Sequence, residues 1–280
     1  MITANTEFWV HHLDPVFIRF AGIEIRYYGL FFALAMLQGG LIWMWQVRRS
    51  GRGWEEALPF IWMGIIGVVV GGRLGNILFY NFGAFLADPL ELLVNWRGGF
   101  ASHGSTAGIL AALWIYSRGH AMPYLEALDR FSLSIPLATV CVRLGNFING
   151  EIVGKASSVP WAVIYPVYDR SRGLYLTPRH PSQLYEAVMG FIVFAVLFAV
   201  DRKLKETRPP GLMTGLILGC YFSGRFLVEF FKEPHVLDPS LFLNMGQILS
   251  LPFALAGWWF VFTTLKKSPG LNIRGHKASN

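Results

Sequence analysis

Residues 57–80, ALPFIWMGIIGVVVGGRLGNILFY, decide the class of fold. This stretch carries a single charged side chain, Arg73, which lies among apolar and small residues. A helix needs about 20 mostly apolar residues to cross the hydrocarbon core of a bilayer, which is about 30 Å thick. We therefore expect this stretch to span a membrane as an α-helix with an arginine inside the span.

Apolar stretches of similar length recur along the whole chain. Of its 280 residues, 54% are hydrophobic and 15% are charged, whereas globular proteins average about 25% charged. The long apolar runs exclude a membrane β-barrel, whose strands are short and alternate. The composition also excludes a disordered chain, a coiled coil and a nucleic-acid-binding tail. We expect an all-α integral membrane protein with seven transmembrane helices, over residues 26–47, 57–80, 100–118, 127–148, 183–201, 211–231 and 243–265.

The distribution of basic residues predicts the orientation of these helices. One set of loops holds 13 of the 24 Lys and Arg residues and the opposite set holds eight. Because cytoplasmic loops carry the excess of positive charge, the N-terminus is expected outside and the C-terminus inside. Residues 1–24 lack the pattern of a cleavable signal peptide and are expected to form an arm along the outer surface.

The long outer loop, residues 149–182, is rich in Gly, Pro, Ser and Tyr. Two β-like runs within it, Trp161–Tyr168 and Leu174–Thr177, flank a turn at Asp169–Gly173. We expect this loop to form a small extracytoplasmic cap rather than a separate domain. No linker divides the chain, so residues 1–280 are predicted to form a single membrane domain.

Three arginines, Arg73, Arg143 and Arg225, lie inside apolar spans. Each costs roughly 2.5–3.5 kcal/mol at the bilayer centre, so each needs a partner, a polar cavity, a bound anion or a route to the surface. All three fall late in spans that run outward. Spans that run inward begin with the polar residues Tyr27, Tyr28, His103, Gln183, Tyr185 and Glu186. The topology therefore predicts a polar cluster in the outer half of the bilayer.

The strongest local motif is Arg143–Gly154, RLGNFINGEIVG. It places a cation, two amides and a carboxylate where a helix leaves the membrane. An arginine there offers a planar fork that suits two-point contact with a phosphate. The alternative is a structural Arg–Glu pair with a helix stop at Gly150. The residues alone favour neither interpretation.

Two further motifs allow both a functional and a structural interpretation. His103 is followed by Gly104, and a neutral histidine can accept a proton near pH 7; a lone histidine near a helix start is more often a hydrogen-bonded interface residue. Tyr221, Arg225 and Glu229 share one helical face, which predicts an Arg225–Glu229 ion pair in a site or in a purely structural contact.

The two cysteines, Cys141 and Cys220, lie in apolar runs and are expected only to pack. They exclude a disulfide scaffold and a cysteine-rich metal site. The histidines do not have the spacing of metal ligands. We therefore expect no metal site.

The chain resembles bacterial phosphatidylglycerol–prolipoprotein diacylglyceryl transferases over nearly its whole length. Residues 143–154 fit the family signature Arg-x-Gly-Asn-Phe-x-Asn-x-Glu-x-x-Gly. Similar motifs are found at 26–29 (RYYG), 72–75 (GRLG), 180–186 (HPSQLYE) and 224–230 (GRFLVEF). His103 looks like the family histidine, although His103-Gly104-Ser105 stands where the family often has His-Gly-Gly.

The resemblance implies transfer of the diacylglyceryl group of phosphatidylglycerol to the lipobox cysteine of a prolipoprotein, with release of glycerol phosphate. This is the first step of lipoprotein maturation, in the bacterial cytoplasmic (inner) membrane with the active site toward the outer leaflet. The resemblance also implies that the reaction needs no metal and no cofactor. The residues expected to be catalytic are His103, Arg143 and Arg225. Those expected to bind substrate are Arg143, Tyr28, Arg73, Asn146, Glu151, Gly154, Tyr221 and Glu229.

Within this site, Arg143 and Arg225 are expected to hold the lipid phosphate. His103 is the candidate base for the thiol, directly or through Tyr28. Asn146 and Glu151 are expected to orient Arg143 or the glycerol headgroup.

Two other classes of function remain open from the residues alone. A transporter or flippase for an anionic solute or lipid would also need buried arginines, and the repeated Arg-Leu-Gly-Asn at 73–76 and 143–146 would suit it. Transporter sites lie near the bilayer midplane, however, on broken helices. A structural membrane scaffold would lock the arginines in ion pairs and tolerate Arg143→Lys, which a phosphate fork would not.

Overall fold

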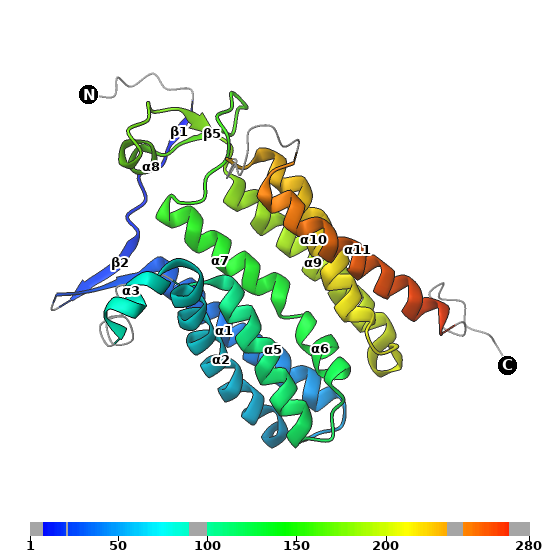
Figure 1. Ribbon diagram of the computed structural model, residues 1–280. Helices are drawn as coiled ribbons and strands as arrows, with labels where there is room; N and C mark the ends of the chain where they lie inside the picture. The colour runs from blue at the N-terminus through cyan, green and yellow to red at the C-terminus, as the bar shows by residue number, and fades with distance from the viewer. Residues whose placement is uncertain (1–7, 21, 90–99, 234–242, 269–280) are drawn as a thin grey trace. The chain divides into compact units, whose positions relative to one another are not determined.

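The computed structural model describes residues 8–20, 22–89, 100–233 and 243–268, and the described chain is mostly helical (Figure 1). Five of its helices are long and apolar enough to cross a membrane. They are α1 (Tyr27–Arg49), α2 (Trp54–Tyr80), α9 (Ser182–Leu204), α10 (Leu212–Val228) and α11 (Met245–Lys266). The helical membrane fold predicted from composition is therefore confirmed.

The two remaining predicted spans also coincide with helices, but with less regular ones. Residues 127–148 overlap α6 (Tyr124–Ser132) and α7 (Ile135–Asn149), which make a sixth candidate span if the broken pair is counted as one. Helix α5 (Ser102–Gly119) occupies the place of the span predicted at 100–118. Helix α5 is less apolar than the five helices above, because its first turns contain the polar residues Ser102, His103, Ser105 and Thr106.

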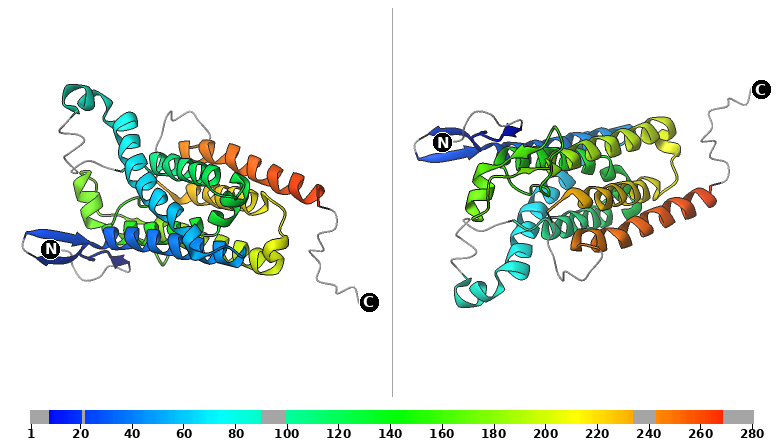
Figure 2. Two further views of the ribbon diagram at one scale, coloured as in Figure 1. Left: turned by 90° about the horizontal axis from the view of Figure 1, so that it is seen from below. Right: turned by 90° about the horizontal axis from the view of Figure 1, so that it is seen from above.

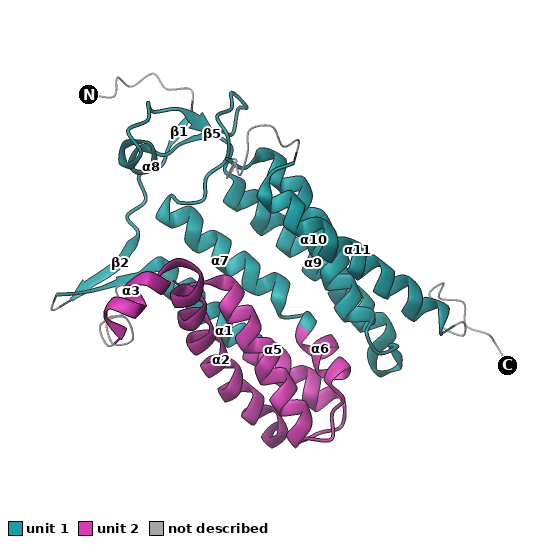
Figure 3. Cartoon of the chain, in the orientation of Figure 1, with its two compact units in different colours: residues 1–39, 132–280 teal, residues 40–131 magenta. Residues whose placement is uncertain are grey.

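The described residues cluster into two compact units (Figure 3). The first comprises residues 1–39 and 132–280, and the second comprises residues 40–131. In the first unit α7 packs on α9, α9 on α10, and α10 on α11. In the second unit α2 packs on α5. The single membrane domain expected over residues 1–280 remains a prediction.

Glycines bring α2 and α5 of the second unit into backbone contact. Gly67 faces Gly108, and Gly71 and Gly75 face Gly104; a Cβ added at Gly75 would lie 2.8 Å from the Gly104 Cα. Small residues allow such close approach in lipid, where van der Waals packing holds helices together. The contact places the backbone around Arg73 beside the start of α5.

Helix α7 of the first unit ends at a glycine, as the structural interpretation of its motif predicts. Gly150 has a φ of 65°, and its N–H donates to the carbonyl oxygens of Asn146 and Phe147. Glycine adopts this left-handed conformation without the penalty of a Cβ. The chain therefore leaves the helix immediately after Asn149.

The outer loop forms a small sheet with the N-terminal arm. Strand β4 (Val163–Ile164) pairs in parallel with β1 (Trp9–Val10) and in antiparallel with β5 (Pro178–Arg179). The two predicted strands, Trp161–Tyr168 and Leu174–Thr177, are wrong for most of their length. Only Val163–Ile164 of the first run forms a strand, because helix α8 (Pro166–Ser171) begins at Pro166, and proline suits a first helical turn. Residues 174–177 belong to no strand. The Asp169 side chain accepts hydrogen bonds from the Thr177 N–H (3.2 Å) and from Arg179 Nε (2.9 Å), which fix the path of the chain before β5.

The arm also contains a hairpin of β2 (Val16–Phe20) and β3 (Ile23–Arg26), which leads directly into α1 (Figure 2). Ile18 pairs with Ile25 and Phe20 pairs with Ile23, and all four are exposed. Arg19 and Glu24 pair on the opposite face and form an ion pair. The hairpin is thus amphipathic, and the expected position of the arm on the membrane surface remains a prediction.

Candidate active site

A buried carboxylate, Glu186, is the centre of the charged cluster in the first unit. It lies in the first turns of α9, and its side chain is 1% exposed. Arg143 Nε lies 2.8 Å and Arg225 Nη1 lies 3.9 Å from Oε2, while Lys232 Nζ lies 3.3 Å from Oε1. One carboxylate therefore holds together cations from α7, from α10 and from the residue after the 3₁₀ turn η2 (Glu229–Phe231).

Arg143 is also held from within its own motif. Its Nη1 donates to Asn146 Oδ1 (3.1 Å), and Asn146 Nδ2 donates to Glu151 Oε1 (2.8 Å). Asn149 Nδ2 donates to the same Glu151 oxygen (3.2 Å). The amides therefore connect Arg143 to a carboxylate at the end of α7, and the predicted orienting role of Asn146 and Glu151 has a geometric basis.

Glu229 has a different partner from the one predicted. We expected it to pair with Arg225 one turn earlier, but its Oε2 lies 3.4 Å from Lys232 Nζ. Helix α10 ends at Val228, and Glu229 begins a 3₁₀ turn, whose three residues per turn no longer continue the α-helical stripe. The Glu229 carboxylate instead approaches Gly246 at the start of α11, where an added Cβ would collide with it.

Two glycines of the motif allow close approach that a side chain would prevent. A Cβ added at Gly145 would lie 3.0 Å from Tyr28 Cδ2, so the tyrosine ring packs directly on α7. A Cβ added at Gly154 would lie 2.5 Å from the His180 carbonyl oxygen and 2.6 Å from that of Phe231. Gly154 also forms an antiparallel bridge with Lys232.

The first unit thus brings together eight of the ten predicted site residues. They are Tyr28, Arg143, Asn146, Glu151, Gly154, Tyr221, Arg225 and Glu229. Arg73 and His103 belong to the second unit, where Arg73 is buried in α2 and His103 is exposed near the start of α5. That these two residues join the cluster remains a prediction.

The sequence placed Glu186 in the predicted polar cluster but gave it no role at the site, and it did not single out Lys232. Glu186 is an acid in an apolar helix, and the cost of burying such a group is a signal that it has a partner or a function. Lys232 follows an apolar run closely and resembles an ordinary outer-loop lysine. Lys232 has a local partner in Glu229, three residues earlier, but the contacts of Glu186 with Arg143, Arg225 and Lys232 join distant parts of the chain, so no local spacing reveals them.

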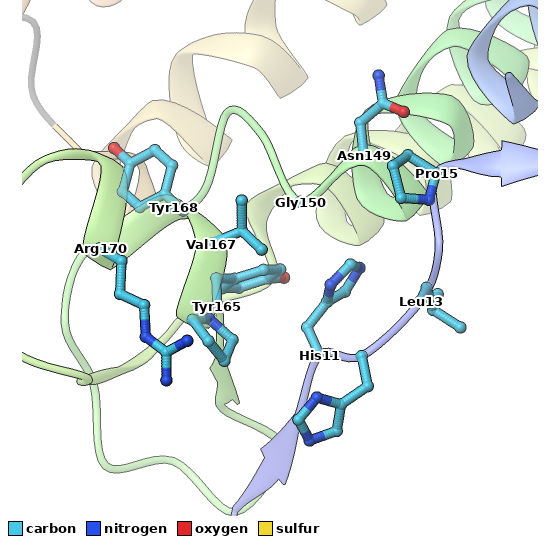
Figure 4. Close-up of a pocket in the computed structure, with 11 residues that line it drawn as sticks. His11, Leu13, Pro15, Asn149, Gly150, Tyr165, Val167, Tyr168 and Arg170 are labelled. Atoms are coloured by element: carbon cyan, nitrogen blue, oxygen red, sulfur yellow. The ribbon is translucent and has the colours of Figure 1, made fainter. Parts of the chain in front are cut away.

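A cavity of about 300 Å³ lies between the N-terminal arm and the cap, at the end of α7 (Figure 4). His11 and Tyr165 face each other in the cavity, and Asn149 and Gly150 of the Arg143–Gly154 motif line another side of it. His11 Nε2 lies 2.8 Å from the Phe147 carbonyl oxygen. Asn149, which lines this cavity, also donates to Glu151 Oε1.

Burial lowers the pKa of His11 despite its contact with the Phe147 carbonyl, and the neighbouring His12 lowers it slightly further. The folded protein therefore resists a proton that the unfolded chain accepts near the ordinary value of about 6.5. We expect the free energy of unfolding to fall as the pH drops below that value. His11→Gln should reduce this loss, measured as the change in melting temperature in detergent between pH 7.5 and pH 5.5. An equal loss in the variant and in the unaltered protein would contradict the assignment.

These helices and buried charges define a polytopic α-helical membrane protein with a cation-rich site built around one carboxylate. Residues 15–263 match the family model described as prolipoprotein diacylglyceryl transferase, and the chain belongs to that family. Three curated relatives are called phosphatidylglycerol–prolipoprotein diacylglyceryl transferase. The chain is 39% identical to that of Vibrio vulnificus (88% of this chain, 89% of the relative), 39% to that of Pseudoalteromonas atlantica (90% of each) and 36% to that of Coxiella burnetii (89% and 95%).

The family resemblance seen in the motifs is therefore confirmed. The chain is a transferase of a bacterial family, and its apolar helices are those of a multi-pass membrane protein.

Proposed function

We propose that this protein transfers the diacylglyceryl group of phosphatidylglycerol to the lipobox cysteine of prolipoproteins. The observation that carries this function is the set of cations around Glu186 in a chain that matches the transferase family over residues 15–263. The donor lipid is anionic, and the acceptor supplies the nucleophilic thiol. The reaction therefore needs buried positive charge but no cysteine of the enzyme.

Arg143 and Arg225 bind the lipid phosphate in this proposal. The acceptor sulfur attacks the terminal glycerol carbon of the diacylglyceryl group, the carbon–oxygen bond to phosphate breaks, and glycerol phosphate leaves. Negative charge on the phosphate grows as that bond breaks, so donors fixed around it stabilise the transition state more than the bound lipid. A guanidinium can provide two parallel N–H groups to a phosphate, and these two side chains are 14% and 27% exposed, less enclosed than Glu186.

The thiol proton is assigned to His103, directly or through Tyr28. A free thiol has a pKa of about 8.5, and neighbouring arginines favour the thiolate. His103 is therefore expected to increase the rate at neutral pH. Arg73 is proposed as an additional contact for the anionic headgroup.

The protein is proposed to have seven spans in the bacterial cytoplasmic (inner) membrane, with the N-terminus outside and the active site toward the outer leaflet. The bias of Lys and Arg between the two sets of loops supports this orientation. The seventh span in this topology is α5. Acceptor prolipoproteins would then reach the site from the side that carries the cap.

A transfer assay tests the proposal. Purified protein in detergent is mixed with phosphatidylglycerol and a peptide that contains a lipobox cysteine, and the peptide mass is followed. We expect a gain equal to the diacylglyceryl group, which disappears without phosphatidylglycerol or when the peptide cysteine is serine. Folded protein without any mass gain would contradict the proposal and favour the transporter or flippase, which flux into sealed vesicles would then test.

A further inference from the structure

The ion-paired groups around Glu186 contain more positive than negative charge. Arg143, Arg225 and Lys232 face the carboxylates of Glu186 and Glu229, which leaves one positive charge in excess. The Glu151 carboxylate stands apart from these ion pairs, since it accepts hydrogen bonds from two amides. A phosphodiester carries one negative charge, so one bound lipid headgroup would balance the charge of these ion-paired groups.

The lysine and the two arginines approach different oxygens of Glu186. Lys232 approaches Oε1 and also lies 3.4 Å from Glu229 Oε2. The two arginines approach Oε2. The Lys232 side chain is 8% exposed, less than either arginine. Lysine is thus enclosed by two carboxylates, whereas the guanidiniums keep further N–H groups for another anion.

We infer that Lys232 and Glu186 are positioning residues that set the affinity for the lipid phosphate without touching it. Glu186 holds two like-charged guanidiniums near each other when no lipid is bound. Lys232 offsets part of the negative charge of Glu186 and Glu229, so these carboxylates compete less with the phosphate for Arg143 and Arg225. This inference rests on the proposed function, because it concerns the lipid site of that reaction.

The backbone fixes Lys232 in this position. Lys232 pairs with Gly154 in an antiparallel bridge, and the N–H of the next residue after Gly154, Lys155, donates to the Phe231 carbonyl oxygen (2.9 Å). The last residue of the Arg143–Gly154 motif and the residue after it therefore hold the lysine against Glu186. The motif contributes Arg143 directly and the position of Lys232 indirectly.

The test compares affinities for the two substrates. Binding of phosphatidylglycerol is measured by native mass spectrometry, and the KM values for phosphatidylglycerol and for the lipobox peptide are measured by transfer. We expect Lys232→Gln to weaken phosphatidylglycerol binding and raise its KM about tenfold, since one partner of a buried charge pair is removed. The KM for the peptide should stay within about twofold. Lys155→Gln, an exposed lysine on the same segment, is the matched control and should change neither value.

Further variants separate charge balance from folding. Lys232→Arg keeps the charge and should bind phosphatidylglycerol within about threefold of the unaltered protein. The double variant Glu186→Gln/Lys232→Gln removes one charge of each sign, and it is compared with both single variants. Its loss of lipid affinity should be smaller than the sum of the losses in Glu186→Gln and in Lys232→Gln. Such non-additivity is the signature of two groups that act through each other.

Three outcomes overturn the inference. They are unchanged phosphatidylglycerol affinity in Lys232→Gln, equal weakening for lipid and peptide in that variant, and additive effects in the double variant. Failure of the proposed function has a different signature, because the unaltered protein would then bind phosphatidylglycerol and not transfer it. The binding measurements test the inference in either case.

Discussion

Arg143→Ala is expected to reduce transfer about a thousandfold while the protein still inserts into the membrane. Removal of one fixed donor to a developing charge costs about 10²–10³ in rate, and Arg143 provides a charged fork. Glu186 keeps Lys232 and Arg225 as partners in this variant, so the buried carboxylate is not left alone. The measurement is the initial rate of diacylglyceryl transfer at equal amounts of folded, membrane-extracted protein.

Two comparisons make the Arg143 result specific. Arg143→Lys keeps the charge but loses the planar fork, so we expect it to lose most of the activity as well. Arg118→Ala removes an exposed arginine that stacks over Trp114 and should leave transfer unchanged. Full activity in Arg143→Ala would rule out the phosphate clamp, and full activity in Arg143→Lys would favour a simple ion pair.

Gly154→Ala is expected to reduce transfer about a hundredfold, the second large effect. The added Cβ would lie 2.5 Å and 2.6 Å from two backbone carbonyl oxygens, those of His180 and Phe231. Backbone atoms cannot rotate away, so the segment must shift and take the paired Lys232 with it. Displacement of a positioning group by about 1 Å can cost about 10² in rate.

The matched control for this variant is Gly39→Ala. Gly39 lies in α1, and an added Cβ there meets nothing within 4 Å. Alanine favours a helix over glycine, so this variant should melt at the same or a slightly higher temperature and keep full activity. Comparable activity of Gly154→Ala and the unaltered protein would show that the Gly154–Lys232 bridge does not determine the site.

Features that depend on local sequence could be predicted. The apolar spans follow from the thickness of the bilayer, and a helix is present at each of the seven expected positions. The helix stop at Gly150 follows from the conformational freedom of glycine. The motif from Arg143 to Gly154 stood out because its polar groups are costly in a membrane, and it contributes Arg143 to the ion pairs around Glu186.

Features that depend on distant parts of the chain could not be predicted. Glu186 collects cations from three separate elements, and their partners are decided by helix packing rather than by spacing along one helix. The Arg225–Glu229 pair was expected from α-helical geometry, but the helix ends before Glu229. The cap strands were misplaced because β1, more than a hundred residues away in sequence, pairs with β4 and decides which residues of the loop are extended.

In the proposed reaction, the bond that breaks is the carbon–oxygen bond between the diacylglyceryl group and the phosphate. The most direct test measures both products in one reaction, namely the lipidated peptide and the released glycerol phosphate. We predict one glycerol phosphate for each modified cysteine, and a sulfur–carbon bond that resists hydroxylamine, as a thioether does. Loss of the modification in hydroxylamine, or modification without glycerol phosphate release, would indicate acyl transfer and would contradict the proposed diacylglyceryl transfer.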